Sequence, residues 1–190
     1  SINPNFIDLP TLFDQGLLTA DELNAARQKT PYACEFERLE RERMPLLSLA
    51  ASRVKNDAPI KEFLKTHPQV ANFCRFMAIK ATNGGDEWLD WESDEPDEAV
   101  LRTWQFTQYE VYRQWMELKA YANRRGVSIV GDIPIYVALD SSDVWANREQ
   151  FQLDKRNRPT AVAGVPPDYF SADGQLWGNP LYDWKRMKAD

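Results

Sequence analysis

The 190-residue sequence has few of the residues that mark several protein classes. It contains one histidine, His67, and two cysteines, Cys34 and Cys74, without metal-binding or redox spacing. We therefore expect two reduced thiols in the core. No apolar run approaches the ~20 residues that span a bilayer, which excludes a membrane helix. Lys and Arg (23) are outnumbered by Asp and Glu (29), and a net charge of −6 argues against a nucleic-acid partner.

Other common signals are also missing. The start, Ser-Ile-Asn-Pro, has neither the basic region nor the apolar core of a signal peptide, and we expect a cytoplasmic protein. There is no glycine-rich phosphate loop and no cluster of metal ligands, so we expect no cofactor and no metal. Aromatic residues, in contrast, are plentiful, with 7 Trp, 7 Tyr and 9 Phe. Such rings stack on sugars or nucleic-acid bases, and the acidic charge favours sugars.

Residues 11–125 have the patterns of a helical region. Thr19 and Glu22 have the spacing of a capping box. Pro31 and Pro45 bracket a charged stretch that is typical of a solvated helix. The sequence predicts helices over residues 35–43, 59–65, 68–82 (ended by Gly84 and Gly85) and about 93–125.

The long fourth helix and its surroundings predict part of a parallel sheet. Gly126 ends this helix, and the apolar strand 127–130 follows it directly. A second short strand is predicted at 6–9, and helix followed by strand is half of a βαβ unit. Two strands cannot close a barrel, which needs about eight. The buried stripe of the helix is predicted at Val100, Trp104, Val111, Trp115, Leu118 and Ala122.

Candidate functional carboxylates follow the strand 127–130. Asp132 lies at its carboxyl end, where α/β enzymes place functional side chains, although it can also cap the next turn. Asp140 and Ser141 precede a short predicted helix, so each is a candidate cap, and Asp140 is also a candidate ligand contact. Trp145 in that helix is expected in the core.

The next segments combine turns with aromatic residues. Residues 147–162 predict a structural hairpin turned at Asn157. Between Gly164 and Gly174, the stiff Pro166-Pro167 pair precedes Tyr169 and Phe170. An aromatic pair on such a loop indicates a lid or binding surface rather than core.

A third aromatic position comes near the end of the chain. Trp177 and Asn179, on either side of Gly178, offer a flat ring and an amide, which suit a hydroxyl-rich ligand.

Several segments together resemble a known family. In the last third they read GDIPIYVALDSSDVWANREQF, NRPTAVAGVPPDYFS and GQLWGNPLYDW, and earlier ones read NPNFIDLPTLFDQGLL and FMAIKATNGGDEWLDW. With these, the chain resembles the amylomaltase, or 4-alpha-glucanotransferase, family of the α-amylase clan. The resemblance is weakest from residue 29 to 66.

The resemblance implies a glycosyltransferase that moves alpha-1,4-glucan segments between maltooligosaccharides and starch- or glycogen-derived dextrins. The reaction is a retaining double displacement between a nucleophilic carboxylate and an acid/base. In the family these lie in motifs of the types RIDHFRG and AEDLG, and a SPY-type motif marks the first strand. These motifs are missing from the 190 residues. The chain is therefore interpreted as a fragment that is inactive alone.

The resemblance also implies the fold class, which is α/β: a helix-rich, incomplete TIM (β/α) barrel with a large helical insertion. Strand edges exposed in such a fragment predict self-association. The expected parts are barrel strand two (1–10), the helical insertion (11–96), a barrel helix with strand three and the following turn (97–145), and a substrate-cleft loop region (146–190).

Site residues are implied position by position, and all are substrate-binding rather than catalytic or metal-ligating. Two departures from the family lie elsewhere: Asn5 replaces an apolar or aromatic residue, and residues 40–44 are charged where the family often has Tyr. The second departure argues against an accessory glucan site in the insertion. The implied contacts are Asp132, Tyr136 and Asp140 on the donor-side rim, Asp168, Tyr169 and Phe170 in the loop over the cleft, and Trp177 and Asn179 against the donor sugar.

Two other hypotheses come from different classes. One is an independently folded alpha-glucan-binding module that stacks sugars on Tyr169, Phe170 and Trp177. It would bind maltodextrins alone, whereas a piece of a larger cleft would bind them weakly or not at all. The other is an interaction protein built on the helices, which leaves the aromatic residues of the last third unexplained.

Overall fold

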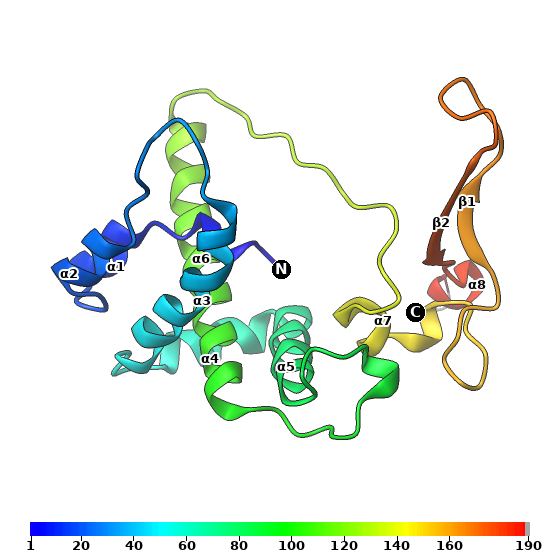
Figure 1. The fold of residues 1–190 in the computed structure, drawn as a ribbon, viewed down its shortest axis with the longest axis horizontal. Helices are drawn as coiled ribbons and strands as arrows, with labels where there is room; N and C mark the ends of the chain where they lie inside the picture. Colours follow the sequence, from blue (N-terminus) through cyan, green and yellow to red (C-terminus); the bar gives the residue numbers. More distant parts are fainter. Residues whose placement is uncertain (189–190) are drawn as a thin grey trace.

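A computed structural model describes residues 1–188, and helices dominate it (Figure 1). Short 3-10 turns η1 (Pro4–Phe6), η2 (Trp88–Asp90) and η3 (Arg148–Gln150) separate some of the longer elements. The α-helices and strands are, in chain order, α1 (Leu9–Asp14), α2 (Ala20–Ala25), α3 (Phe36–Ser52), α4 (Ala58–Thr66), α5 (Pro68–Thr82), α6 (Glu98–Arg124), α7 (Ser142–Ala146), β1 (Val162–Val165), β2 (Gln175–Pro180) and α8 (Trp184–Met187).

The long helix α6 organises a helical body. It packs against α3, α4 and α5 and against the N-terminal turn η1 (Figure 1). Leu12, Leu47 and Ala50 are fully buried in the core between these helices. Burial of such apolar faces, more than helix propensity, stabilises helices of this length.

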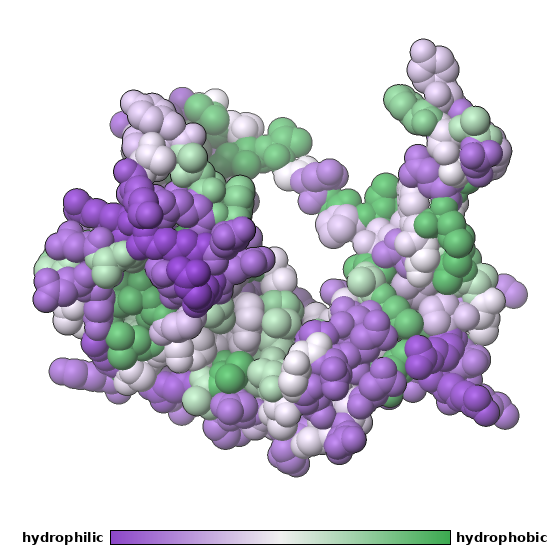
Figure 2. Space-filling view, in the orientation of Figure 1, coloured by the Kyte–Doolittle hydropathy of each residue, from purple (hydrophilic) through white to green (hydrophobic). Residues whose placement is uncertain are grey.

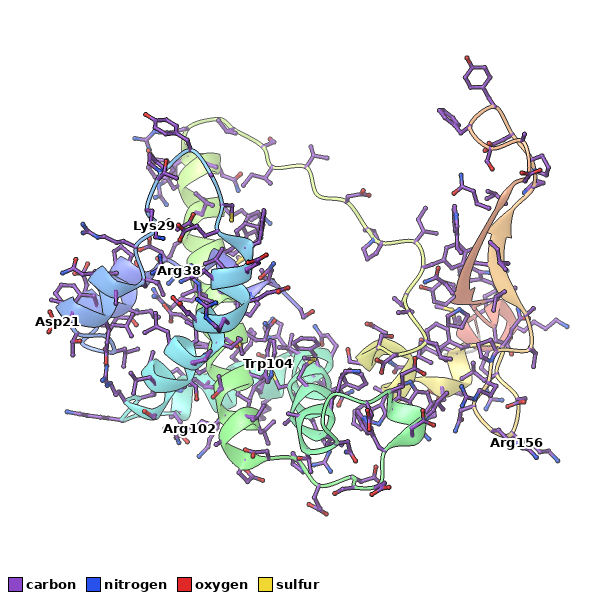
Figure 3. All side chains as sticks on the ribbon, in the orientation of Figure 1. Asp21, Lys29, Arg38, Arg102, Trp104 and Arg156 are labelled. Atoms are coloured by element: carbon purple, nitrogen blue, oxygen red, sulfur yellow. The ribbon has the colours of Figure 1, made fainter. Side chains whose placement is uncertain are left out.

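Helix α5 joins this body to a second apolar cluster. On one side Phe73 meets Trp104 of α6 edge-to-face, with ring centroids 5.4 Å apart, and Figure 3 shows Trp104 between the two helices. On the other side Phe76 contributes to a cluster with Trp88, Val144 and Phe151. Trp145, predicted in the core, is half-buried and packs there against Phe76. The cluster thereby attaches α7 and the hairpin to the helical body.

The predicted strand at 127–130 is wrong for the described chain. Residues 127–137 run in an extended path from the end of α6 to α7, without a neighbouring strand (Figure 1). Gly126, with φ of +74°, ends α6 as predicted. The apolar sequence suits a strand, but ladder hydrogen bonds need a second strand beside it. The only sheet in residues 1–188 is the antiparallel pair β1 and β2.

The predicted strand at 6–9 is also wrong. Asp8 caps α1 instead, accepting hydrogen bonds from the N–H of Thr11 (3.0 Å) and from its hydroxyl (2.7 Å). Pro10 fits the first turn of this helix, a helix-start signal in the sequence.

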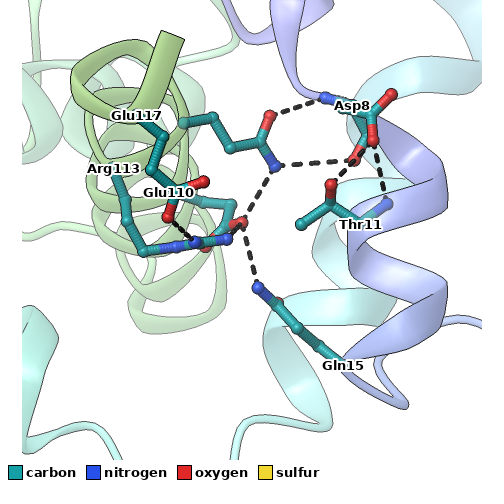
Figure 4. A network of polar contacts seen from close by, with 7 residues as sticks. Asp8, Thr11, Gln15, Glu110, Arg113 and Glu117 are labelled. Atoms are coloured by element: carbon teal, nitrogen blue, oxygen red, sulfur yellow. Dashed lines mark hydrogen bonds and ion pairs between the residues drawn. The ribbon is translucent and has the colours of Figure 1, made fainter. Parts of the chain in front are cut away.

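Two glutamines of α6 take the place of a partner strand for the N-terminal segment. The Gln108 side chain accepts from the N–H of Ile2 (2.9 Å) and donates to its carbonyl (2.8 Å). Gln114 accepts from the N–H of Asp8 (2.7 Å) and also donates to Glu110 (2.9 Å), within the network drawn in Figure 4. Side-chain amides thus satisfy backbone groups that a sheet would otherwise satisfy.

The helix predicted over 35–43 runs on through Pro45 to Ser52. A proline inside a helix costs about 3 kcal/mol. Leu47 and Ala50, buried beyond Pro45, offset this cost, and Pro45 itself is exposed. The capping box of Thr19 and Glu22 is confirmed, and so are the helices at α4, α5 and α6.

The predicted stripe of α6 is buried only in part. Val111 is buried, but Trp115 is 39% exposed and Leu118 is 54% exposed.

Of the two thiols predicted in the core, Cys74 is buried and Cys34 is exposed. Burial raises the pKa of Cys74 to about 12. No helix among residues 1–188 is long and apolar enough to cross a membrane.

An acid-sensitive ion pair fixes α2 to α3. Glu22 accepts from Arg53 (2.6 and 2.8 Å) and from the N–H of Thr19, which lowers the pKa of Glu22 from 4.5 to about 2. A lowered pKa stabilises the fold above pH 4.5, and this contribution is lost as the pH falls toward 2. We expect Glu22→Gln to reduce the dependence of the unfolding free energy on pH in this window, measured by urea denaturation. Glu40→Gln is the control, because Glu40 has no hydrogen bond or ion pair within residues 1–188, and an equal effect of both would contradict the prediction.

Candidate functional site

The candidate site is carried by the hairpin of β1 and β2. Gly164 pairs with Leu176 and Val165 with Gln175, with an irregularity between Val162 and Gly164. Gly174 closes the loop with φ of +72°, and a Cβ there would lie 2.5 Å from the Val165 carbonyl oxygen. Only glycine fits this position, so the sequence fixes where the hairpin turns back.

The loop at the tip of the hairpin presents two aromatic rings to solvent. Tyr169 is 98% exposed and Phe170 is 88% exposed, and their rings meet edge-to-face at 5.7 Å. The Asp168 carboxylate accepts from the N–H groups of Phe170 and Ser171, both at 2.9 Å. Asp168 therefore shapes the loop, and the exposure of the pair agrees with the surface role predicted for it.

A row of aromatic rings lies at the base of the hairpin. Trp177, on β2, meets Tyr136 edge-to-face with ring centroids 5.8 Å apart. Tyr136 in turn lies parallel to Tyr182 at 6.2 Å, and Tyr182 is 5.3 Å from Trp184. Trp177 is 47% exposed and Trp184 is 62% exposed, so the row has open ring surface. We call these four residues the aromatic row.

Tyr182 and Trp184 were not predicted as site residues. They stand two positions apart in LYDW, a pattern that places both rings near Trp177 once β2 has formed. Phe151 packs against Tyr182, with ring centroids 5.1 Å apart. Burial, together with nearby Asp143 and Tyr136, raises the pKa of the Tyr182 hydroxyl.

Asn179 ties the row to the extended segment. Its side-chain amide donates to the Val137 carbonyl (2.9 Å), which fixes the segment beside β2 and places Tyr136 near Trp177. Asn179 is therefore a positioning residue in this structure, and its amide oxygen has no protein partner within residues 1–188.

The three predicted carboxylates lie apart and take part in local structure. Asp132 is exposed in the extended segment and accepts from the N–H of Ile133 (2.8 Å). Asp140 pairs with Lys80 of α5 and accepts from the N–H of Trp88 (3.3 Å). Asp168 holds the hairpin tip. The structure thus brings together Tyr136, Trp177 and Asn179, but not the carboxylates.

Asp140, a candidate cap in the sequence, forms an ion pair instead of capping α7. Its ion pair with Lys80 is three-quarters buried and fixes the start of α7 to α5. Ser141 is the residue that caps α7, accepting from the N–H of Val144 (3.4 Å). In the part of the chain that the structure describes, no group of three His, Cys, Asp or Glu side chains is arranged to hold a metal ion.

Comparison with known proteins identifies the family. A family model described as 4-alpha-glucanotransferase matches residues 1–190. The chain belongs to the 4-alpha-glucanotransferase family. The 4-alpha-glucanotransferase of Synechocystis sp. is 40% identical, over 100% of this chain and 42% of that protein. The 4-alpha-glucanotransferase of Thermus thermophilus is 38% identical, over 99% of this chain and 41% of that protein.

A solved structure shares the fold. The amylomaltase from Streptococcus agalactiae in complex with acarbose superposes with a TM-score of 0.86 at 36% identity, over 98% of this chain and 42% of that one. The helical body, extended segment and hairpin therefore have the arrangement found in a 4-alpha-glucanotransferase. The chain spans about two fifths of the length of the relatives it matches.

Proposed function

We propose that this chain contributes substrate-binding structure to an enzyme that transfers alpha-1,4-glucan segments between maltodextrins by a retaining double displacement. The observation that carries the proposal is the aromatic row, with its open ring surface, in a chain of the 4-alpha-glucanotransferase family. Glucose units present apolar faces ringed by hydroxyl groups, which suit stacking on Trp177 and Trp184. The solved relative was bound to acarbose, which supports a ligand of sugar type.

The proposal includes no catalytic carboxylate among the residues of this chain. A retaining mechanism needs two carboxyl groups about 5–5.5 Å apart on a rigid framework. The Asp132 carboxylate instead accepts from the N–H of Ile133. Asp140 is paired with Lys80, and Asp168 accepts from the N–H of Phe170 in the hairpin loop. We propose that these three carboxylates maintain the structure of the binding surface, and that Asp140 does so through its ion pair with Lys80.

The test uses a chimera in which residues 1–190 replace the matching stretch of the Synechocystis relative. We expect the chimera to disproportionate maltotriose, and Trp177→Ala to raise KM and lower kcat/KM about ten- to thirtyfold, since loss of a stacked Trp costs about 2 kcal/mol. Tyr32→Ala is the matched control, because Tyr32 is 95% exposed and lies in the loop before α3. A folded chimera without transfer, or equal effects of the two variants, would contradict the proposal.

An independent alpha-glucan-binding module is the second candidate. It is favoured by the way the aromatic row is held by contacts within the hairpin region itself, through Phe151 and Asn179. Titration of the isolated chain with maltoheptaose, followed by tryptophan fluorescence, separates the two. Binding in the micromolar to millimolar range that Trp177→Ala abolishes supports a module, whereas weak or no binding supports a part of a larger cleft.

A further inference from the structure

Residues 136–140 lead into α7 without any backbone pairing. Among the described residues, their N–H and C=O groups form no hydrogen bond to another backbone group. Side chains from two sides hold them instead. From β2, the Asn179 amide donates to the Val137 carbonyl (2.9 Å), and from α5, Lys80 pairs with the Asp140 carboxylate. The position of this segment therefore depends on a few bonds to side chains.

Trp88 of η2 supplies two further hydrogen bonds to the same segment. Its ring Nε1–H donates to the Leu139 carbonyl (2.7 Å), and its backbone N–H donates to the Asp140 carboxylate (3.3 Å). Trp88 is 6% exposed and belongs to the apolar cluster that attaches α7 to the helical body. The Arg148 guanidinium lies over its ring, 4.7 Å from the centroid. The donor is thus fixed by its own packing, independently of the segment that it binds.

The aromatic row begins at the residue next to this segment of side-chain bonds. Tyr136 directly precedes Val137, and its ring meets those of Trp177 and Tyr182. The hairpin offers little packing to fix these rings, because Trp177 is 47% exposed and its neighbour Leu176 is 81% exposed. Figure 2 shows hydrophobic side chains lying open along the hairpin. The contact between Tyr136 and Trp177 therefore depends on how the chain after Tyr136 is held.

We propose that Trp88 is a positioning residue for glucan binding, which acts through the Leu139 carbonyl to hold Tyr136 against Trp177. The inference rests on the proposed function of the aromatic row. Trp88 itself is too buried to stack on a sugar. A displaced ring weakens contacts that are made equally in the ground state and in the transition state, so its loss raises KM and leaves kcat nearly unchanged.

A pair of tryptophan variants in the chimera tests the proposal. Trp88→Phe keeps an aromatic ring in the cluster but removes the donor to Leu139. We expect it to raise KM for maltotriose about three- to tenfold, the usual effect of one hydrogen bond, and to change kcat less than about twofold. Trp91→Phe is the matched control, because Trp91 packs in the same cluster and its Nε1–H donates to the Asp86 carbonyl (3.0 Å), outside residues 136–140. It is expected to leave KM unchanged.

Two further readouts separate positioning from a general loss of stability. In the Trp177→Ala chimera, adding Trp88→Phe is expected to raise KM no further, because the ring that is positioned is already missing. In the 190-residue chain labelled with fluorotryptophan, the fluorine resonance of Trp177 is identified by its absence from Trp177→Ala. We expect Trp88→Phe to shift this resonance and Trp91→Phe to leave it in place.

Three results would overturn the proposal: equal KM values for Trp88→Phe and Trp91→Phe, additive effects in the double variant, or an unmoved Trp177 resonance. Asp140→Asn replaces Trp88→Phe if that variant does not fold, since it weakens the pair with Lys80 that holds the same segment, and the same three results decide. If Trp177→Ala leaves KM unchanged, the proposed function is contradicted and the inference falls with it. If Trp177→Ala raises KM but Trp88→Phe does not, only the inference is contradicted.

Discussion

The isolated chain is expected to transfer no measurable glucan between maltotriose molecules, at a rate at least about ten-thousandfold below that of the chimera. Loss of a catalytic group from an enzyme that acts through several groups costs about this much. The reason lies in the placement of the carboxylates. Asp132 and Asp168 sit in separate local turns, and Asp140 is paired with Lys80, so the described structure does not hold two of them as a nucleophile and an acid.

The measurement is the appearance of glucose and longer maltodextrins from maltotriose, resolved by chromatography over a day. The chimera provides the matched control, because it contains the same residues 1–190. Turnover by the isolated chain at a rate comparable with the chimera would show that this chain has its own catalytic pair. Absence of turnover in both would instead contradict the proposed function.

The second large effect is expected on stability. Leu47, fully buried on α3 against α6, lies at the centre of the helical core. We expect Leu47→Ala to lower the free energy of unfolding by about 2–5 kcal/mol, because it removes apolar contacts and leaves a cavity. Leu49→Ala is the matched control, since Leu49 is on the same helix and 39% exposed, and it should cost much less.

Urea denaturation followed by helical circular dichroism measures both variants. Equal losses from Leu47→Ala and Leu49→Ala would show that α3 does not pack on α6 in solution. If only Leu47→Ala lowers the free energy of unfolding, this would also explain why α3 continues through Pro45. Leu47 lies beyond the proline, and its burial offsets the cost of a proline inside the helix.

Local signals predicted the helices because their causes are local. Prolines in first turns, an Asp cap and glycines with positive φ act within a few residues. Pro59 and Pro68 lie in the first turns of α4 and α5, and Asp97 caps α6. Gly84 and Gly126, both with positive φ, follow the ends of α5 and α6. The turn at Asn157, with φ of +59°, was predicted for the same reason. The end of α3 was not predicted. Pro45 is a local stop signal, but the burial of Leu47 and Ala50 against other helices outweighs it.

The strands were predicted wrongly because pairing is not a local property. Residues 127–130 have a strand sequence, yet a strand exists only where another lies beside it. In the N-terminal segment, Gln108 binds the backbone of Ile2 and Gln114 binds the N–H of Asp8, each 106 positions away in the chain. Nothing in the N-terminal sequence itself indicates these partners.

The candidate site was predicted in its residue types and only partly in its arrangement. Tyr136, Trp177 and Asn179 do lie together, and the Tyr169–Phe170 pair is exposed on the hairpin tip. The role of each residue in binding stays a prediction. Tyr182 belongs to the aromatic row but was not predicted as a site residue. Its neighbours depend on strand pairing and on the contact with Phe151, and not on the residues next to it in the sequence.

The sequence by itself determined the family, the helices α4, α5 and α6 and the turn at Asn157, because motifs, helix-start and helix-stop residues and the conformation of a turn residue depend on neighbouring residues. It did not determine the pairing of β1 with β2. The tertiary structure decided which apolar side chains are covered, where the carboxylates lie and which aromatic rings meet. Those outcomes depend on contacts between segments distant in the chain, such as the hydrogen bonds of Gln108 and Gln114 to the N-terminal segment.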